Sequence, residues 1–182
     1  MRLFVAIEIA ADIREELVNY VSQVKPRLTD ARWSGSEGLH ITLKFLGNVQ
    51  DEKRTAIEAK LSAVQAARFQ VSIAGVGLFP NERSPRVLWA GLTAPPDLST
   101  LADAVEDAME SLGFERERRA YSPHITLARF KDGVSRSALD AALAGAPKNG
   151  FGTMAATEFH LYESKPSPQG SRYSKLASFA LR

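Results

Sequence analysis

The tetrapeptide His-Ile-Thr-Leu occurs twice in the chain, beginning at His40 and again at His124. These two copies use two of the three histidines in the sequence. Side chains of a β-strand alternate between its faces. Each copy therefore presents an imidazole and a hydroxyl side by side, His40 with Thr42 and His124 with Thr126. Facing each other across a cleft, the copies would supply a general base, a general acid and two hydroxyl donors, a set suited to attack on a phosphate diester without a metal.

The residues that follow each copy indicate a duplication rather than chance. Lys44 and Phe45 follow the first copy, and Arg129 and Phe130 follow the second, so a cation and an aromatic residue recur. The two histidines are 84 positions apart, close to half of the 182 residues, which favours an internal repeat. The alternative is two buried strands that share β-branched residues and each carry a satisfied structural histidine.

Composition describes an ordinary globular chain. Its 182 residues can form one domain, spanning 1–182, or two small lobes with a real core. Cysteine is absent, which excludes disulfides and thiolate metal sites. Residues 1–9 read as a first strand rather than a signal peptide, and no apolar run approaches the roughly 20 residues of a membrane span. We therefore expect a cytoplasmic protein with no membrane contact.

The charge pattern permits contact with a polyanion but does not require it. The formal net charge is +2, and the most basic stretch is 116–119, just before the second motif. Acidic residues alternate with its arginines. We keep two interpretations of this stretch, a solvated loop and a rim that steers phosphate.

The expected elements predict an α+β fold with largely antiparallel sheets, because hairpins interrupt any regular βα alternation. Each half reads as strand, helix, motif strand, helix and hairpin. We expect two similar lobes with helices on the outer faces and the motif strands facing a central groove. The expected strands span 2–9, 39–46, 69–79, 86–92, 123–130, 152–163 and 173–181, and the expected helices span 12–25, 51–65, 98–112 and 135–144.

At these residues the chain resembles the 2H phosphoesterases, whose signature is a pair of His-x-Thr-x motifs about 80 residues apart. It is similar, more narrowly, to the RNA 2′,3′-cyclic phosphodiesterases, also called 2′-5′ RNA ligases. Four further segments match that narrower group, in the expected order. They are residues 2–7, 39–47, 85–92 and 161–164, the last followed by Gly170 and Tyr173.

The resemblance implies a bilobal fold with pseudo-two-fold symmetry and one His-x-Thr-x strand per lobe in a shared cleft. It implies hydrolysis of a 2′,3′-cyclic phosphate at an RNA 3′ end to a 2′-phosphomonoester. Some members also join such ends to a 5′-hydroxyl through a 2′-5′ bond. No metal and no nucleotide cofactor are expected, and we expect a monomer.

The two histidines would divide the proton transfers of this reaction. A 2′-phosphate product requires the 3′ oxygen to leave, and by the family pattern we assign His40 as the acid and His124 as the base. The sequence leaves the reverse assignment open. Thr42 and Thr126 would donate to the non-bridging phosphate oxygens, whose charge grows in the transition state. Their alternative role is ordinary β-branched filling of a strand.

For two cations near the motifs, Arg129 and Lys44, strand alternation and the family pattern must be compared to decide which face of the strand each side chain occupies. The family pattern assigns phosphate contact to Arg129, but regular alternation would send a residue five positions after His124 to the opposite face. A bulge or strand end must intervene if Arg129 is to reach the cleft. Lys44 has the same parity as His40 and is the substitute candidate, or simply a charge on the rim.

Aromatic side chains near the cleft could stack on an unpaired nucleobase. Most aromatic residues in a domain of this size are core, so each candidate has that alternative. His160 lies outside both motifs and is expected to be structural. The stacking or rim candidates are Phe45, Tyr121, Phe79, Trp33 and Trp89.

Two other functions remain open from the sequence. The same catalytic residues could act on a small cyclic nucleotide or on an ADP-ribose cyclic phosphate. A protein of another class, a non-catalytic module that binds RNA or nucleotides, could keep the fold without turnover. The two complete motifs argue against the second of these.

Overall fold

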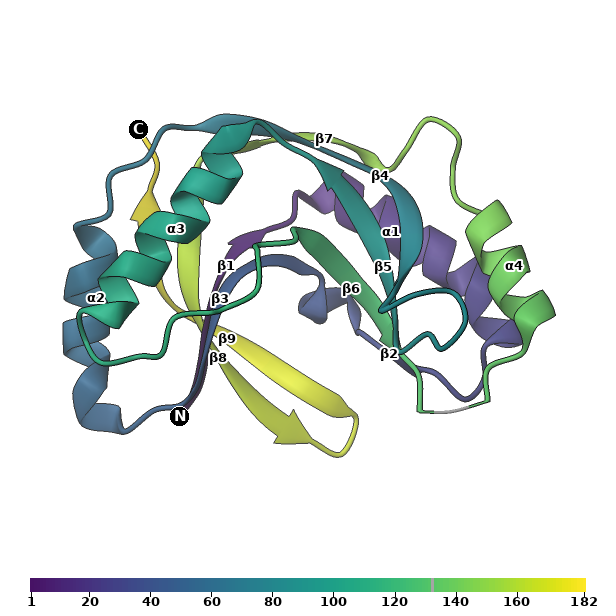
Figure 1. Ribbon diagram of the computed structural model, residues 1–182, viewed down its shortest axis with the longest axis horizontal. Coiled ribbons are helices and arrows are strands. Elements are labelled where there is room, and N and C mark those ends of the chain that lie inside the picture. The colour runs from purple at the N-terminus through teal and green to yellow at the C-terminus, as the bar shows by residue number, and fades with distance from the viewer. Residues whose placement is uncertain (132) are drawn as a thin grey trace.

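The computed structural model describes residues 1–131 and 133–182. It has the expected α+β architecture, with two antiparallel sheets flanked by helices (Figure 1). The strands are β1 (Arg2–Glu8), β2 (Arg32–Trp33), β3 (His40–Asn48), β4 (Phe69–Phe79), β5 (Val87–Thr93), β6 (His124–Arg129), β7 (Gly152–Ala156), β8 (Glu158–Ser167) and β9 (Gly170–Ala180). The α-helices are α1 (Ala11–Val24), α2 (Arg54–Ser62), α3 (Pro96–Glu110) and α4 (Arg136–Ala144), and short 3₁₀ turns span Lys25–Arg27, Ser36–Gly38 and Asp51–Lys53.

The two sheets have matching strand orders. The first sheet runs β3-β1-β8-β9, and the second runs β6-β5-β4-β7 with the short β2 added outside β6. Each motif strand therefore pairs with an inner strand, β1 or β5, and a further pair of strands follows in the same order. This correspondence confirms the predicted pseudo-two-fold arrangement of two lobes.

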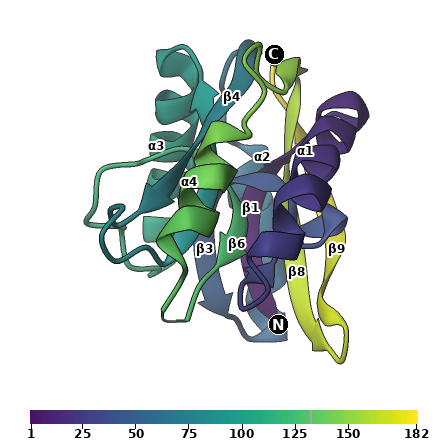
Figure 2. The same ribbon diagram turned by 90° about the vertical axis from the view of Figure 1, so that its right-hand side faces the viewer.

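Each of the two lobes is built from segments of both halves of the chain. The β4–β5 hairpin comes from the first half but pairs with β6, while the β8–β9 hairpin comes from the second half and pairs with β1. Helices cross over in the same way. Helices α2 and α3 pack on the first sheet at β9 and β3, whereas α1 packs on the second sheet at β7 (Figures 1 and 2). Tyr20 of α1 donates its hydroxyl to the carbonyl of Ala142 in α4, 2.6 Å away.

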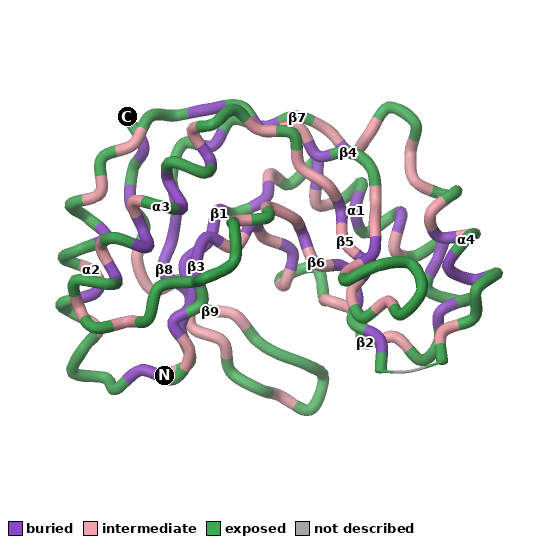
Figure 3. The backbone as a smooth tube through the Cα atoms, viewed as in Figure 1, coloured by how far each residue is buried: buried purple, intermediate pink, exposed green. Residues whose placement is uncertain are grey.

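The core lies between each sheet and its helices, and it takes up the apolar residues of both motifs. Ile41, Leu43, Ile125 and Leu127 are all buried, as the alternation predicts. Buried segments run along β1 and β3 at the centre of the molecule (Figure 3). Among the helices in the described ranges, none is long and apolar enough to cross a membrane.

One expected strand is wrong in a way that explains how the two sheets are connected. The segment predicted as a single strand, 152–163, is two strands that are separated at Thr157. The first, β7, pairs with β4 at the edge of the second sheet, and the next, β8, pairs with β1 in the first sheet. The apolar pattern runs through the break because only the pairing partner changes. Ser135 does cap α4, since its hydroxyl accepts from the amide of Ala138.

Lys44 does not lie on the rim or in the cleft, so both interpretations of this residue are wrong. It is buried, with 7% of its surface exposed, on the helix-covered face of the first sheet. Its ammonium group lies 2.8 Å from the carboxylate of Glu106 in α3 and 3.0 Å from the carbonyl of Glu115. Lys44 therefore ties the motif strand to α3 and to the segment that leads to the second motif.

Replacing Lys44 by methionine should destabilise the fold by about 3–5 kcal/mol, because Glu106 would remain as a buried charge without its partner. Chemical denaturation followed by circular dichroism measures this change. Arg116→Met is the matched control. It removes the ion pairs that the exposed Arg116 forms with two exposed carboxylates of α3, Asp107 and Glu110, and should therefore alter stability little. Equal shifts in the two variants would contradict the structural role of the buried pair.

Candidate active site

Both motif strands carry a β-bulge at the same position. In β3, Thr42 pairs with Ala6 and Lys44 with Val5, so Leu43 is the extra residue of the bulge. In β6, the register with β5 shifts in the same interval, immediately after Thr126. Such a shift reverses the alternation of the side chains that follow it, up to the next shift in the strand. The fifth residue after each histidine therefore returns to the face of the histidine and the threonine.

The bulge that Arg129 requires is thus present. Thr126 pairs with Trp89 and Ala128 with Leu88, which leaves Leu127 as the extra residue. Arg129 is exposed, whereas Leu127 and Ala128 are both buried. Arg129 therefore shares the face of His124 and Thr126, as the sequence prediction demanded, and the same shift turns Lys44 to the opposite face in the first motif.

The two motif strands lie close together, at the junction of the two sheets. Cα atoms of β3 and β6 approach within 8 Å, and both strands lie in the middle of the molecule (Figure 1). The hydroxyl of Tyr121, three residues before His124, donates to the carbonyl of Thr42 at 2.9 Å. Tyr121 thus links the two motifs through the backbone, and burial holds the pKa of its hydroxyl above the usual range.

His40 lies among aromatic rings contributed by the other strands of the first sheet. The rings of Phe4 and Tyr162 are nearly parallel to the imidazole, with centroids at 4.9 and 5.5 Å, and Tyr173 presents an edge at 5.2 Å. Burial, with a smaller effect of the Arg14 guanidinium, lowers the pKa of His40 to about 4. The free protein therefore holds this imidazole neutral at neutral pH.

Arg14 approaches His40 from α1, a helix that belongs to the other lobe. Its guanidinium donates to the carbonyl of Ser36, in the 3₁₀ turn that leads into β3, and to the carbonyl of Ile9 at 3.4 Å. Both acceptors are neutral backbone carbonyls, so these two hydrogen bonds do not neutralise the positive charge of Arg14. This explains why Arg14 disfavours a proton on His40.

His124 has a fixed tautomer. Its Nδ1 lies 2.8 Å from the carbonyl oxygen of Ser122. A carbonyl can only accept, so Nδ1 carries the hydrogen and Nε2 keeps its lone pair in the neutral ring. The ring of Phe79 meets the imidazole edge-on, with centroids 5.1 Å apart, and Phe79 in turn lies 5.1 Å from Trp89.

Trp89 fills the second sheet beside Thr126 because its neighbour on β4 is a glycine. A Cβ atom on Gly77 would lie 2.1 Å from the indole, so the ring occupies the space a side chain would take. The indole Nε1 is buried, and within the described part of the chain it has no hydrogen-bond partner. Phe79 and Trp89 thus form the wall beside the second motif.

The two remaining aromatic candidates, Phe45 and Trp33, lie on opposite faces of their sheets, one on the histidine face and one on the core side. Phe45 is 68% exposed and shares the face of His40 and Thr42, with its ring 6.1 Å from that of Phe4. Trp33 pairs with Ala128, which places its indole on the core side, where Nε1 donates to a backbone carbonyl. The prediction of Trp33 as a stacking residue is wrong for that reason.

His160 lies inside the first sheet, buried to 1% exposure. Its Nδ1 shares a 2.8 Å hydrogen bond with the Ser178 hydroxyl on the neighbouring strand, and burial lowers its pKa. These features agree with the structural role expected for this residue.

Sequence reasoning missed the residues around His40. Phe4, Tyr162 and Tyr173 come from three strands, and they meet only because β1 and β8 lie between β3 and β9. The resemblance marks the segments that hold Phe4 and Tyr162, but nothing in it indicates a contact with the imidazole. The register of Phe4 opposite both Phe45 and Tyr162 is the signal that would have grouped them.

The basic stretch 116–119 behaves as a solvated loop in part. Arg116 pairs with the carboxylates of Asp107 and Glu110 at 2.5 and 3.1 Å, which raises its pKa, and Arg118 pairs with Glu115 at 3.3 Å. These partners neutralise the charge that a phosphate-steering rim would need.

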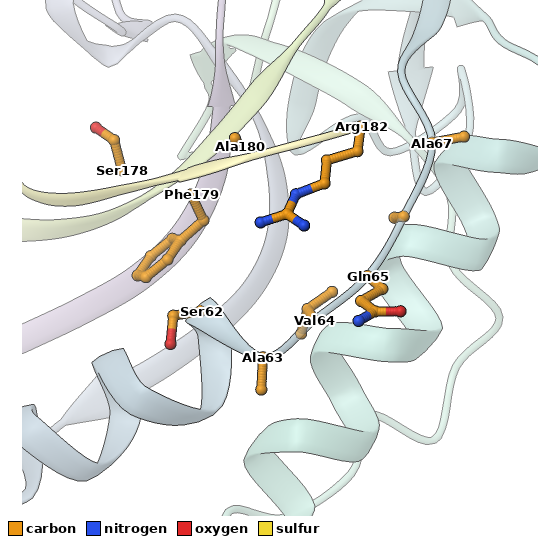
Figure 4. A pocket seen from close by; sticks show the side chains of 10 residues that line it. Ser62, Ala63, Val64, Gln65, Ala67, Ser178, Phe179, Ala180 and Arg182 are labelled. Atoms are coloured by element: carbon orange, nitrogen blue, oxygen red, sulfur yellow. The ribbon is translucent and has the colours of Figure 1, made fainter.

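A hollow of about 610 Å³ lies away from both motifs (Figure 4). It is bordered by the segment after α2 and by the end of β9, and the guanidinium of Arg182 is directed into it. Its lining contains no histidine and no carboxylate side chain. Across the described ranges, no three His, Cys, Asp or Glu side chains are grouped so as to hold a metal ion.

Comparisons with known proteins give a consistent family. The model of the family described as "LigT like Phosphoesterase" matches residues 7–89 and 92–173, and each matched segment contains one motif. An RNA 2′,3′-cyclic phosphodiesterase of Archaeoglobus fulgidus is 35% identical over 179 residues, covering 98% of this chain and 99% of the relative.

Solved structures agree with this result over the full length. The protein TT0787 of Thermus thermophilus has a TM-score of 0.83 at 31% identity, covering 100% of this chain and 98% of the other. E. coli LigT complexed with 3′-AMP also has a TM-score of 0.83 at 31% identity, with coverage of 99% and 97%.

In the free protein, NMR titration of the imidazole resonances should give a pKa near 4 for His40. Arg14→Gln should raise that value by removing a positive charge, yet keep it below 6.5 because burial is the larger cause. Lys25→Gln, which removes an exposed charge just after α1, is the control.

Since the pKa of His40 is lower in the folded than in the unfolded protein, the free energy of unfolding should fall as pH drops from about 6.5 towards 4. Titration of His40 at its ordinary value would contradict the buried environment.

Proposed function

The chain belongs to the LigT-like phosphoesterases of the 2H superfamily, and on that premise we propose that it hydrolyses RNA 2′,3′-cyclic phosphate ends to 2′-phosphomonoesters. The observation that carries the proposal is the matched pair of bulged His-x-Thr-x strands at one junction. A cyclic phosphate between them would meet an imidazole and a hydroxyl from each side. The relatives named RNA 2′,3′-cyclic phosphodiesterase support this substrate class.

His124 acts as the general base in this proposal. Its Nδ1–H is held by the Ser122 carbonyl, so Nε2 is available to take a proton from the attacking water. Water then attacks phosphorus as the 3′ oxygen leaves on the opposite side, and the phosphate stays on the 2′ oxygen. The same displacement with a 5′-hydroxyl as nucleophile would form a 2′-5′ bond, which is how ligation would arise from this geometry.

His40 acts as the general acid and must first gain its proton. In the free protein its pKa is about 4. A bound anionic phosphate favours the imidazolium, and the near-parallel faces of Phe4 and Tyr162 lie within about 6 Å, the range over which aromatic rings attract cations. His40 therefore takes up a proton with the substrate and delivers it to the leaving 3′ oxygen.

The threonines and Arg129 stabilise the charge that develops on phosphorus. Hydroxyls of Thr42 and Thr126 donate to the non-bridging oxygens, and the guanidinium of Arg129 supplies the cation that a dianionic transition state requires. The bulge after Thr126 supports this role, because it returns Arg129 to the face of His124. Phe45, exposed beside Thr42, provides a ring on which the terminal base can stack.

Incubation of the protein with an oligoribonucleotide that ends in a 2′,3′-cyclic phosphate should release 2′-phosphate ends, with the same rate in EDTA. The acid, the base and the charge-stabilising groups are all side chains of this chain, so chelation should remove nothing that the reaction uses. Phosphatase-coupled mass spectrometry identifies the product end. A 3′-phosphate product, or activity lost in EDTA and restored by a divalent ion, would count against the mechanism.

Substituting either His40 or His124 by alanine should lower kcat/KM by at least ~10²-fold, the lower end for a general acid or base. His160→Gln is the control and should retain turnover if its melting temperature is maintained. A substrate with sulfur in place of the 3′ bridging oxygen distinguishes the two roles, because a thiolate leaves without a proton. This substrate should restore turnover to His40→Ala and not to His124→Ala. The reverse pattern would exchange the acid and the base.

A further inference from the structure

We propose that Arg32 binds the phosphate on the 5′ side of the terminal nucleotide, so that the site prefers a substrate with this phosphate, as an RNA chain end has, over a nucleoside 2′,3′-cyclic phosphate that lacks it. This inference rests on the proposed function and assigns a residue outside both motifs. It begins from one observation, that Arg32 on β2 is the direct cross-strand partner of Arg129 on β6.

Arg32 points to the same face as Arg129. Residues that pair directly across an antiparallel ladder share a face. The next pair in this ladder, Trp33 with Ala128, lies on the core side, and both arginines are exposed. The bulge in β6 therefore turns both guanidinium groups to the side of His124 and Thr126.

The pair is electrostatically unfavourable for the fold itself. Like charges directly opposite each other on neighbouring strands destabilise a sheet. Within residues 1–131 and 133–182, neither Arg32 nor Arg129 has a carboxylate within 4 Å. Some other exposed arginines do have such partners, as Arg116 has Asp107 and Arg136 has Asp140. Two unpaired guanidinium groups at one point of the sheet are what an anionic ligand would compensate.

The two arginines lie at different distances from the motif residues, so each can bind a different phosphate group of the RNA. Along β6, Arg129 follows Thr126 by the equivalent of two regular strand positions, roughly 7 Å. Strand β2, which carries Arg32, lies one strand further out, about 4.8 Å beyond β6, at the edge of the second sheet (Figure 1). A cyclic phosphate held by the histidines and Arg129 thus leaves Arg32 free to bind the next phosphate of the chain. A nucleoside 2′,3′-cyclic phosphate has no such group.

Three substrates test the assignment directly. They are adenosine 2′,3′-cyclic phosphate, its 5′-phosphorylated form and the dinucleotide ApA with a 2′,3′-cyclic phosphate. In Arg32→Gln, the ratio of kcat/KM for the dinucleotide to that for adenosine 2′,3′-cyclic phosphate should fall about 10-fold, the scale of one charge-assisted contact. The ratio for the 5′-phosphorylated mononucleotide should fall in the same way, and the salt dependence for the dinucleotide should weaken by roughly 0.7 in log–log slope.

Arg32→Glu separates this role from a structural one. It replaces a repulsive pair by an attractive one, so the melting temperature should not fall while turnover of the dinucleotide falls further than in Arg32→Gln. Lys60→Gln, an exposed cation on α2 of the other lobe, is the control for net charge and should change neither ratio.

The outcomes also separate this inference from the proposed function. If the wild-type protein hydrolyses all three substrates but Arg32→Gln lowers their kcat/KM values equally, the subsite is wrong and the proposed function stands. Unchanged ratios in Arg32→Gln would overturn the subsite in the same way. If the wild-type protein hydrolyses none of the three, the proposed function fails and the subsite fails with it.

Discussion

The β-bulge that follows Thr42 and Thr126 is the constraint on which the rest of the site depends. A regular strand would carry the alternation onward and place Lys44 beside the histidine and Arg129 behind the sheet. One extra residue in each strand reverses this order, so that Lys44 joins the core and Phe45 and Arg129 return to the histidine face. The repeated motif is thus a repeated backbone deviation as well as a repeated set of side chains.

The two lobes give their histidines different surroundings on the same backbone frame. His40 lies against Phe4, Tyr162 and Tyr173, where burial lowers its pKa, while a backbone carbonyl fixes the tautomer of His124. The bulge presents a ring at one strand and a cation at the other. This asymmetry suits a reaction that needs one proton donor, one proton acceptor and an end of RNA bound in a single direction.

The sequence predicted the helices and strands, which depend on local patterns of residues. It did not predict the side-chain contacts that depend on which strands pair and in which register. The helices, the motif strands and the buried positions Ile41, Leu43, Ile125 and Leu127 follow from periodicity. The surroundings of His40, the burial of Lys44 and the opposition of Arg32 to Arg129 follow from which strands pair. Pairing between strands far apart in the sequence leaves no local signal. The bulge was inferable only because the family pattern required Arg129 to face the cleft.

The most direct test is a crystal structure of the protein bound to ApA carrying a 2′-phosphate, the product of the proposed reaction. The account predicts the terminal phosphate between the imidazoles of His40 and His124, within hydrogen-bond distance of the Thr42 and Thr126 hydroxyls and of the Arg129 guanidinium. A phosphate bound in the hollow beside Arg182, or an Arg129 side chain turned away from the bound phosphate, would contradict it.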